Sequence, residues 1–315
     1  MAAIGPHRLH SSPPSFPVRS PPPSKIYRAR TPASSASHHM DLQVQGRRRL
    51  KDFPYVSAPH RDLMVELVST VETRLDPHLL PCTLPPDVQY YQNPTNTAHA
   101  SLHIRSGHKS SPIDFILGSW LHCELPSGGA LNITSLSANL NPSTDAPNFL
   151  LELIQSSPTS LILILDLPPR KDLVLHPDYL RTFYEDTQLE RQRQLLEKIP
   201  EVRPYFSSSL YIRCVVSPTA ILVRIESEAG GGRRMEEIVQ DHVHPIAKEV
   251  LGIWLDRCAS GESSVGETER AALEKRDQLV KNKTIEIDLG SSMPRLFGPE
   301  ITDRVLGAIQ EVFNS

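Results

Sequence analysis

Three consecutive segments with the period of a β-strand constrain the fold of this chain most strongly. In residues 97–105 apolar and polar side chains alternate, which predicts a half-buried strand. Residues 113–125 are apolar on both faces, as in a central strand, and residues 130–140 alternate again after a two-glycine turn. Because only short turns separate them, these segments predict an antiparallel meander.

The rest of the body contains helical and strand patterns without a regular β-α-β order. Apolar residues at helical spacing predict helices over 59–75, 147–155, 177–199, 233–257, 267–281 and 299–313. Shorter apolar or alternating runs predict strands over 160–167, 208–216, 219–226 and 284–289. Together with the meander they predict an α+β fold, in which an antiparallel sheet of about six or seven strands is sandwiched between helices.

The first forty residues differ in composition from everything that follows. They contain eight prolines, eight serines and five basic residues but no acidic residue. Such a segment cannot bury enough apolar surface to fold, and it lacks the apolar core of a secretory signal. We expect residues 1–40 to be a disordered plastid transit peptide, with the mitochondrion left open as a second destination. Residues 41–52 are interpreted as a basic linker and 53–315 as a single catalytic domain.

Charge and missing motifs exclude several classes of protein. Without the leader the body has a formal charge of −8, which does not suit a nucleic-acid-binding protein. The longest clean apolar run is far too short to cross a membrane. No dinucleotide fingerprint, P-loop, nucleophile elbow or C-x-x-C pair is present, and we predict neither a metal site nor a bound cofactor. His99 and His103 are four residues apart on a predicted strand, a spacing too long for one metal ion.

Four long blocks of sequence carry a family resemblance. They read PYVSAPHRDLMVELVSTVETRL (54–75), LPCTLPPDVQYYQNPTNTAHASLHIRSGHKSSPIDFILGSWLHCELPSGGALNITSLSANLN (80–141), APNFLLELIQSSPTSLILILDLPPRKDLVLHPDYL (146–180) and KTIEIDLGSSMPRLFGPE (283–300). These blocks closely resemble the red chlorophyll catabolite reductases of plants, and the likeness covers residues 53–313. The resemblance implies the fold of the ferredoxin-dependent bilin reductases, an α/β/α sandwich.

The resemblance also implies an activity in chlorophyll breakdown in senescing leaves. The substrate is then red chlorophyll catabolite, an open-chain tetrapyrrole, whose C20/C1 double bond is reduced to give the primary fluorescent catabolite. Reduced ferredoxin supplies the electrons, and pheophorbide a oxygenase supplies the substrate. The implied location is the chloroplast stroma, and the implied assembly is a homodimer. The alternative is a carrier that binds the pigment without reducing it.

Two carboxyl groups are the candidates for proton donation. Glu152 interrupts an apolar string, but the pattern alone favours a solvated helix face for it. Asp288 shares one face of a predicted strand with Glu286, which also fits a solvated face. The resemblance assigns catalytic roles to Glu152 and Asp288. The bilin reductases carry a catalytic aspartate on a strand similar to PIDFILGSW, but this chain has Ser119 and Trp120 there. Proton donation must therefore come from other residues.

Further candidates concern the substrate and the electron donor. His99, His103 and Arg105 form a polar strip that can bind a propionate, or that is simply a sheet face covered by helices. Val216 is expected to set, by its size, which face of the substrate is protonated; the alternative is an ordinary core valine. Ferredoxin is acidic, so docking on this acidic body needs a local basic patch. The candidates for that patch are Lys275, Arg276, Lys281 and Lys283, or alternatively Arg233 and Arg234.

Overall fold

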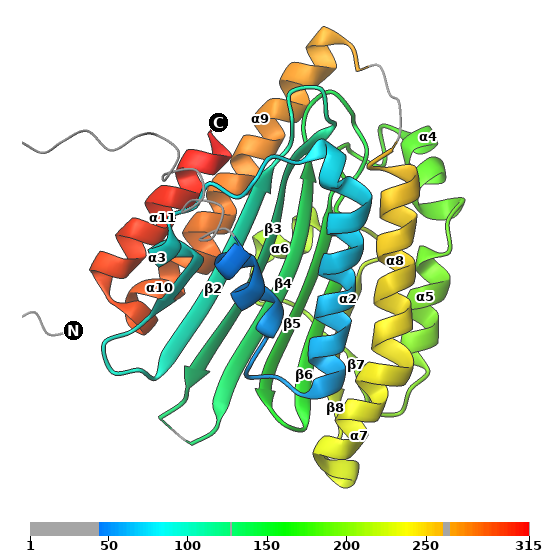
Figure 1. Cartoon of the computed structure of the whole chain (residues 1–315). Coiled ribbons are helices and arrows are strands. Elements are labelled where there is room, and N and C mark those ends of the chain that lie inside the picture. Colours follow the sequence, from blue (N-terminus) through cyan, green and yellow to red (C-terminus); the bar gives the residue numbers. More distant parts are fainter. Residues whose placement is uncertain (1–43, 127, 261–264, 315) are drawn as a thin grey trace, which may run out of the picture.

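The structure is a computed structural model, and it describes residues 44–126, 128–260 and 265–314. The leader predicted at 1–40 lies outside the described residues. Figure 1 shows a central twisted sheet with helices on both sides. This arrangement confirms the predicted α+β sandwich.

The described chain forms an eight-stranded sheet in which every pair of neighbouring strands is antiparallel. The strand order is β1-β2-β3-β4-β5-β6-β8-β7. The strands are β1 Tyr90–Gln92, β2 Ala98–Ser106, β3 Ile113–Glu124, β4 Ala130–Leu140, β5 Phe149–Ser157, β6 Ser160–Asp166, β7 Val202–Pro204 and β8 Ile221–Glu226. The predicted meander is β2-β3-β4, and consecutive hairpins extend it to β6.

The helices are distributed along the chain around this sheet. The α-helices are α2 Ala58–Leu75, α3 Pro86–Gln89, α4 Pro177–Leu180, α5 Leu189–Glu197, α6 Leu210–Val215, α7 Gly231–Ile238, α8 His244–Arg257, α9 Glu267–Thr284, α10 Gly290–Phe297 and α11 Pro299–Phe313. Shorter turns of 3₁₀- or π-helix are η1 Asp76–His78, η2 Arg181–Glu185, η3 Glu228–Gly230, η4 Val239–Val243 and η5 Ile285–Leu289.

The two faces of the sheet are covered very differently. We call the face that packs against α2 and α8 the closed face; its central cross-strand row is Trp120, Thr134, Leu153, Leu163 and Val223. All five of these side chains are buried. The opposite face is called the open face, and its central row is Leu102, Ser119, Ser135, Glu152, Ile164 and Leu222.

Helices α10 and α11 cover only one side of the open face. There Ala98, Ala100, Leu102 and Ile104 of β2 are buried in one apolar cluster with Met293, Phe297, Val305 and Ile309. Strand β2 is therefore covered on both faces, and the half-buried strand predicted there is wrong. At the centre of β3, β4 and β5 the open-face side chains, such as Ser119, Ser135 and Glu152, are only half-buried, and they alternate with fully buried ones of the closed face. In this half-covered area the helices leave the sheet partly accessible.

Residues 147–155 were expected to form a helix, but 149–157 form strand β5. The starting signal, Asp145 followed by Pro147, suits a helix N-terminus, whereas the apolar string after it alternates between faces. Leu151 and Leu153 are completely buried on the closed face, while Leu150, Glu152 and Ile154 point to the open face. Pairing with β4 and β6 satisfies the backbone and overrides the local helix signal.

Two segments predicted as strands are helical. Within 208–216, residues 210–215 form α6, whose N-cap Ser209 accepts a hydrogen bond from the Ile212 N–H. Residues 284–289 form the end of α9 and the turn η5, which continues into α10. Apolar residues recur every four positions from Ile285 to Phe297, at Leu289 and Met293. The helical spacing is therefore visible over 284–297 but not within 284–289 alone.

Residues 44–52 were expected to be a solvated linker, but they are helical and pack onto the sheet. Leu50 is 1% exposed, and the Trp120 indole N–H donates to the carbonyl oxygen of Arg49. Arg47 and Lys51 both form ion pairs with Glu72 of α2. The folded domain therefore begins before residue 53.

Candidate functional site

Glu152 lies near the centre of the open face, in the half-covered area. Its directly opposed neighbours are Ser135 on β4 and Ile164 on β6, and Ser119 on β3 continues the same row. Side chains opposed in this way stand about 5 Å apart. Glu152 is half-buried, and so are Ser119 and Ser135. The sheet thus presents a carboxyl group beside hydroxyl groups, on a floor that is otherwise apolar.

The segment that contains Asp288 covers the same face. Ile285, at the start of η5, is buried in the apolar cluster that β2 forms with α10 and α11. Since η5 is part of this layer, its backbone lies on the same side of the sheet as Glu152. The side chain of Asp288 lies outside the described part of the structure.

Helix α6 and Val216 border the half-covered area at the far end of β6. Val216 is the C-cap residue of α6 and is half-buried. The next residue, Ser217, donates hydrogen bonds to the carboxylate of Asp166, an open-face residue of β6. Burial raises the pKa of Tyr211 in α6, and the positive charges of Arg276 and Lys283 on α9 oppose this increase.

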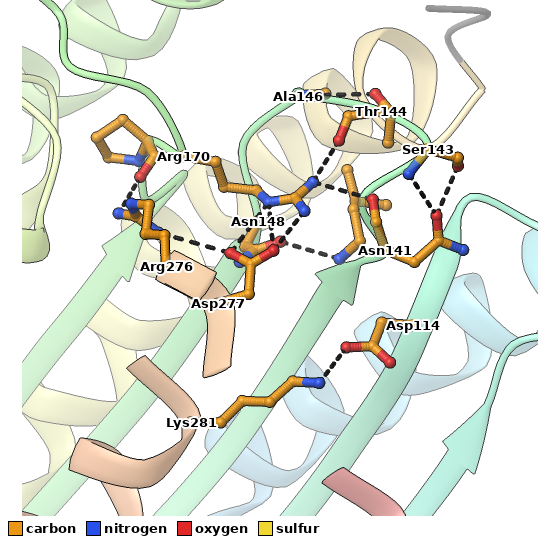
Figure 2. A network of polar contacts seen from close by, with 12 residues as sticks. Asp114, Asn141, Ser143, Thr144, Ala146, Asn148, Arg170, Arg276, Asp277 and Lys281 are labelled. Atoms are coloured by element: carbon orange, nitrogen blue, oxygen red, sulfur yellow. Dashed lines mark hydrogen bonds and ion pairs between the residues drawn. The ribbon is translucent and has the colours of Figure 1, made fainter. Parts of the chain in front are cut away.

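Helix α9 is held against the sheet by a buried polar network (Figure 2). The Arg170 side chain is 0% exposed and donates to both carboxylate oxygens of Asp277, with a shortest distance of 2.5 Å. The same guanidinium donates to the carbonyl oxygens of Asn141 and Thr144. One buried cation thus joins α9 to the loop between β4 and β5, which fixes the helix that leads into η5.

A second ion pair holds the last turn of α9. The Lys281 ammonium lies 2.6 Å from the carboxylate of Asp114, and its side chain is 12% exposed. Burial raises the pKa of Asp114, and Lys281 lowers it. Lys281 also donates to the carbonyl oxygen of Phe313, so it connects β3, α9 and α11.

Of the four basic residues proposed to bind ferredoxin, two are engaged inside the protein. Lys281 has the contacts just described, and Arg276 donates to the carbonyl oxygen of Pro169. Lys275 is exposed, and Lys283 forms a surface ion pair with Glu286. Of these four residues, Lys275 and Lys283 are therefore the ones whose charge is accessible.

The polar strip of β2 lies on the closed face, away from Glu152. His103 is buried, and this burial lowers its pKa to about 4. Arg105 forms an ion pair with Asp76 and donates to two carbonyl oxygens. His99 is hydrogen-bonded to the Tyr90 hydroxyl and to the carbonyl oxygen of Asn96. The strip therefore agrees with the alternative interpretation, a sheet face covered by helices. Its side chains and Glu152 lie on opposite faces of the sheet.

Sequence reasoning missed Asp166 and Arg170. Asp166 ends the strongly apolar strand β6, directly after the run Leu161–Leu165, and Arg170 follows Pro168-Pro169. An apolar run of this kind predicts a strand that is buried on both faces. Charged residues next to such a strand are rarely buried without a partner, and this pattern could have identified both residues.

Among the described residues, no group of three or more His, Cys, Asp or Glu side chains is arranged to hold a metal ion. No helix in the described ranges has the length and apolar character needed to span a bilayer.

Comparisons with known proteins agree with this architecture. The family model of red chlorophyll catabolite reductase (RCC reductase) matches residues 59–311. The chain is 54% identical to the chloroplastic red chlorophyll catabolite reductase of Arabidopsis thaliana, over 99% of both chains. It is 48% identical to the chloroplastic red chlorophyll catabolite reductase 1 of Oryza sativa subsp. japonica, over 82% of this chain and 79% of the relative.

Among solved structures, the fold is similar to that of phytochromobilin synthase from tomato, crystallised with biliverdin. The TM-score is 0.60 at 16% identity, over 80% of this chain and 84% of the other. That likeness concerns the fold and confirms the predicted relation to the bilin reductases. With a family model that matches residues 59–311 and a relative 54% identical over nearly the whole chain, the protein belongs to the red chlorophyll catabolite reductase family.

Proposed function

We propose that this protein reduces red chlorophyll catabolite to the primary fluorescent chlorophyll catabolite, at the C20/C1 double bond. Family membership supports the substrate, and the observation that carries the chemistry is the position of Glu152. It is a carboxyl group on the half-covered face, in one row with Ser119 and Ser135. A planar tetrapyrrole lying over this face has its reacting carbons within reach of that carboxyl group.

The reaction adds two electrons and two protons to the substrate. Ferredoxin delivers one electron at a time, so the reduction passes through a substrate radical, and each electron is matched by a proton. We assign proton donation to Glu152 and Asp288, one from the sheet and one from the helical layer that covers it. A positioned acid contributes about 10²–10⁴-fold to such a step.

Orientation of the pigment is the second task of the site. Val216 borders the half-covered area and is half-buried, so its side chain can limit the tilt of the bound tetrapyrrole. We assign to Val216 the choice of the substrate face that receives the proton. If Val216→Phe left the stereochemistry of the product unchanged, this assignment would be abandoned.

Electron delivery requires a docking surface for ferredoxin. We propose Lys275 and Lys283 of α9 as its centre, because both side chains are accessible and α9 leads directly into η5. Arg276 and Lys281, engaged in internal contacts, contribute by holding the helix in place.

The names of two relatives support a proposal for the location of the protein in the cell. Both are named chloroplastic, and we propose the chloroplast stroma as the location, with pheophorbide a oxygenase as the source of the substrate. We also propose that the protein works as a homodimer in senescing leaves.

The decisive experiment is anaerobic incubation of the full chain with red chlorophyll catabolite, ferredoxin and a ferredoxin-reducing system. We expect the wild type to form a blue-fluorescent product and Glu152→Gln/Asp288→Asn to form none while retaining the pigment. Glu286→Gln is the matched control, since Glu286 is an exposed carboxylate of the same turn as Asp288. Tight pigment binding without reduction in the wild type would make the protein a carrier and refute the catalytic assignments.

A further inference from the structure

Asp166 is a buried carboxylate for which the described residues supply no ion-pair partner. It is the last residue of β6 and is 2% exposed. Ser217 binds both of its oxygens, since the Ser217 N–H donates to Oδ2 at 2.9 Å and the Ser217 hydroxyl donates to Oδ1 at 2.5 Å. The backbone N–H of Leu167 also donates to this carboxylate. Burial raises the pKa of this carboxyl group to about 6. Burying this negative charge costs free energy, and the hydrogen bonds from the turn at Ser217 offset much of that cost.

The Ser217 side chain is itself held in place by the turn. Its oxygen accepts a hydrogen bond from the Thr219 N–H and lies 3.1 Å from the Thr219 hydroxyl. The Ala220 N–H donates to the Ser217 carbonyl oxygen. The connection between α6 and β8 is therefore fixed to the end of β6 by hydrogen bonds that all pass through Ser217.

Asp166 and Glu152 lie on the same face of neighbouring strands. Glu152 is opposed to Ile164 and Leu150 is opposed to Asp166, so the two carboxylates are diagonal neighbours on the open face. Diagonal neighbours in a sheet are separated by roughly 7–8 Å. The turn bound by Asp166 begins directly after Val216. The hydrogen bonds between Asp166 and Ser217 thus join the open face of the sheet, which contains Glu152, to the segment that contains Val216.

We propose that Asp166 is a positioning residue, which through Ser217 holds Val216 and α6 over the open face and so sets the orientation of the bound tetrapyrrole relative to Glu152. This inference rests on the proposed function, because it assigns a role at the same site. It explains why a buried carboxylate is present at a position where an apolar residue would complete the strand at lower cost.

The test compares three variants in the anaerobic assay. Asp166→Asn keeps the shape of the side chain but directs an amide N–H toward one of the two Ser217 donors. Ser217→Ala keeps the N–H bond to Asp166 and removes the hydroxyl, with its bond to Asp166 and its contacts to Thr219. We expect Asp166→Asn to shift the epimer ratio at the newly reduced carbon and the KM for the pigment by about fivefold, with kcat changed less. Ser217→Ala should shift both in the same direction by a smaller factor.

Ser227→Ala is the matched control. Ser227 is a buried serine at the other end of β8, and its hydroxyl donates to the carbonyl oxygen of Gly231. It should lower stability by a similar amount and leave the epimer ratio unchanged. A merely structural role for Asp166 predicts the same unchanged ratio for Asp166→Asn.

The outcomes separate this inference from the proposed function. An unchanged epimer ratio and KM in folded Asp166→Asn overturns the positioning role while the reductase activity of the wild type stands. If Asp166→Asn does not fold, Ser217→Ala decides in the same way. If the wild type binds the pigment without reducing it, the proposed function fails. The positioning role of Asp166 is then tested by the affinity for the pigment, which should fall about fivefold in Asp166→Asn but not in Ser227→Ala.

Discussion

The two faces of the central sheet are built from the same strands but differ in how they are covered. On the closed face, alternate residues of β3 to β8 are packed against α2, α7 and α8 in one large apolar cluster. On the open face, the intervening residues of β3 to β5 remain half-buried and include Ser119, Ser135, Ser137 and Glu152. Burial of apolar area stabilises the fold, so the closed face contributes most of the stability.

The contrast shows how one sheet serves as both scaffold and site. Polar groups on the closed face are paired within the protein, as in the hydrogen bond between His60 of α2 and Thr134 of β4. The open face retains polar side chains in an incompletely covered area, where a ligand can complete the burial. Helix α9 covers part of that area and is held there by Arg170 and Lys281.

The sharpest test of this division uses two neighbouring residues that point to opposite faces. Glu152→Gln should lower the rate of pigment reduction by about 10³-fold, because it removes the proposed proton donor. It should leave the free energy of unfolding nearly unchanged, since the amide has the same shape. Steady-state kinetics and urea unfolding of the same preparation measure both quantities. A large loss of stability would show that Glu152 belongs to the scaffold.

Leu153→Ala should show the converse behaviour. Leu153 is fully buried on the closed face, and its truncation should lower the free energy of unfolding by about 4 kcal/mol through lost packing and a new cavity. The folded fraction should reduce the pigment at a rate close to that of the wild type. Ile154→Ala, a half-buried residue of the open face, is the comparison, and an equal loss of stability there would contradict the distinction between the faces.

Acid should destabilise the closed face through its buried histidine. Burial lowers the pKa of His60 to about 4 from its ordinary value of 6.5. Between these pH values this histidine binds more protons in the unfolded state than in the folded state. The free energy of unfolding therefore rises with pH from about 4 to 6.5, and above that range His60 no longer changes it. The full difference is about 3 kcal/mol.

His60→Gln removes this titration and retains a partner for Thr134. Urea unfolding at pH 4, 5, 6 and 7 should therefore give a flatter dependence for the variant than for the wild type. His103, whose pKa burial also lowers to about 4, should act in the same direction. Parallel pH profiles for wild type and His60→Gln would show that His60 does not carry this effect.

The smallest effect is expected at the surface of α9. Lys275→Glu/Lys283→Glu should raise the KM for ferredoxin several-fold at low ionic strength, and the difference should shrink with added salt. The control is Lys198→Glu, an exposed lysine that follows α5 in the other helical layer, compared with Lys275→Glu alone so that both variants change the charge equally. An equal effect at Lys198 would indicate that net charge, and not a docking site on α9, controls the association.

Much of the architecture was predictable because several local signals agreed. The alternation in 97–105 and 130–140 and the helical spacing in 59–75 predicted β2, β4 and α2 nearly to their ends. Predictions were wrong where a short apolar run fits two periods, as in 147–155 and 284–289. There the choice depended on whether a neighbouring strand was available to pair with the backbone, which is information that lies far away in the sequence.

For the site, the sequence alone determined the residue types and the family, and alternation determined that neighbouring side chains in each strand point in opposite directions. Only the tertiary structure decided that α2 closes one face and that α9 to α11 cover part of the other. That choice puts His99, His103 and Arg105 in the scaffold and leaves Glu152 on the open face. The physical reason is that burial is a property of layers packed across the whole chain. A strand pattern defines two faces, and only the packing of distant helices determines which of them remains accessible to a ligand.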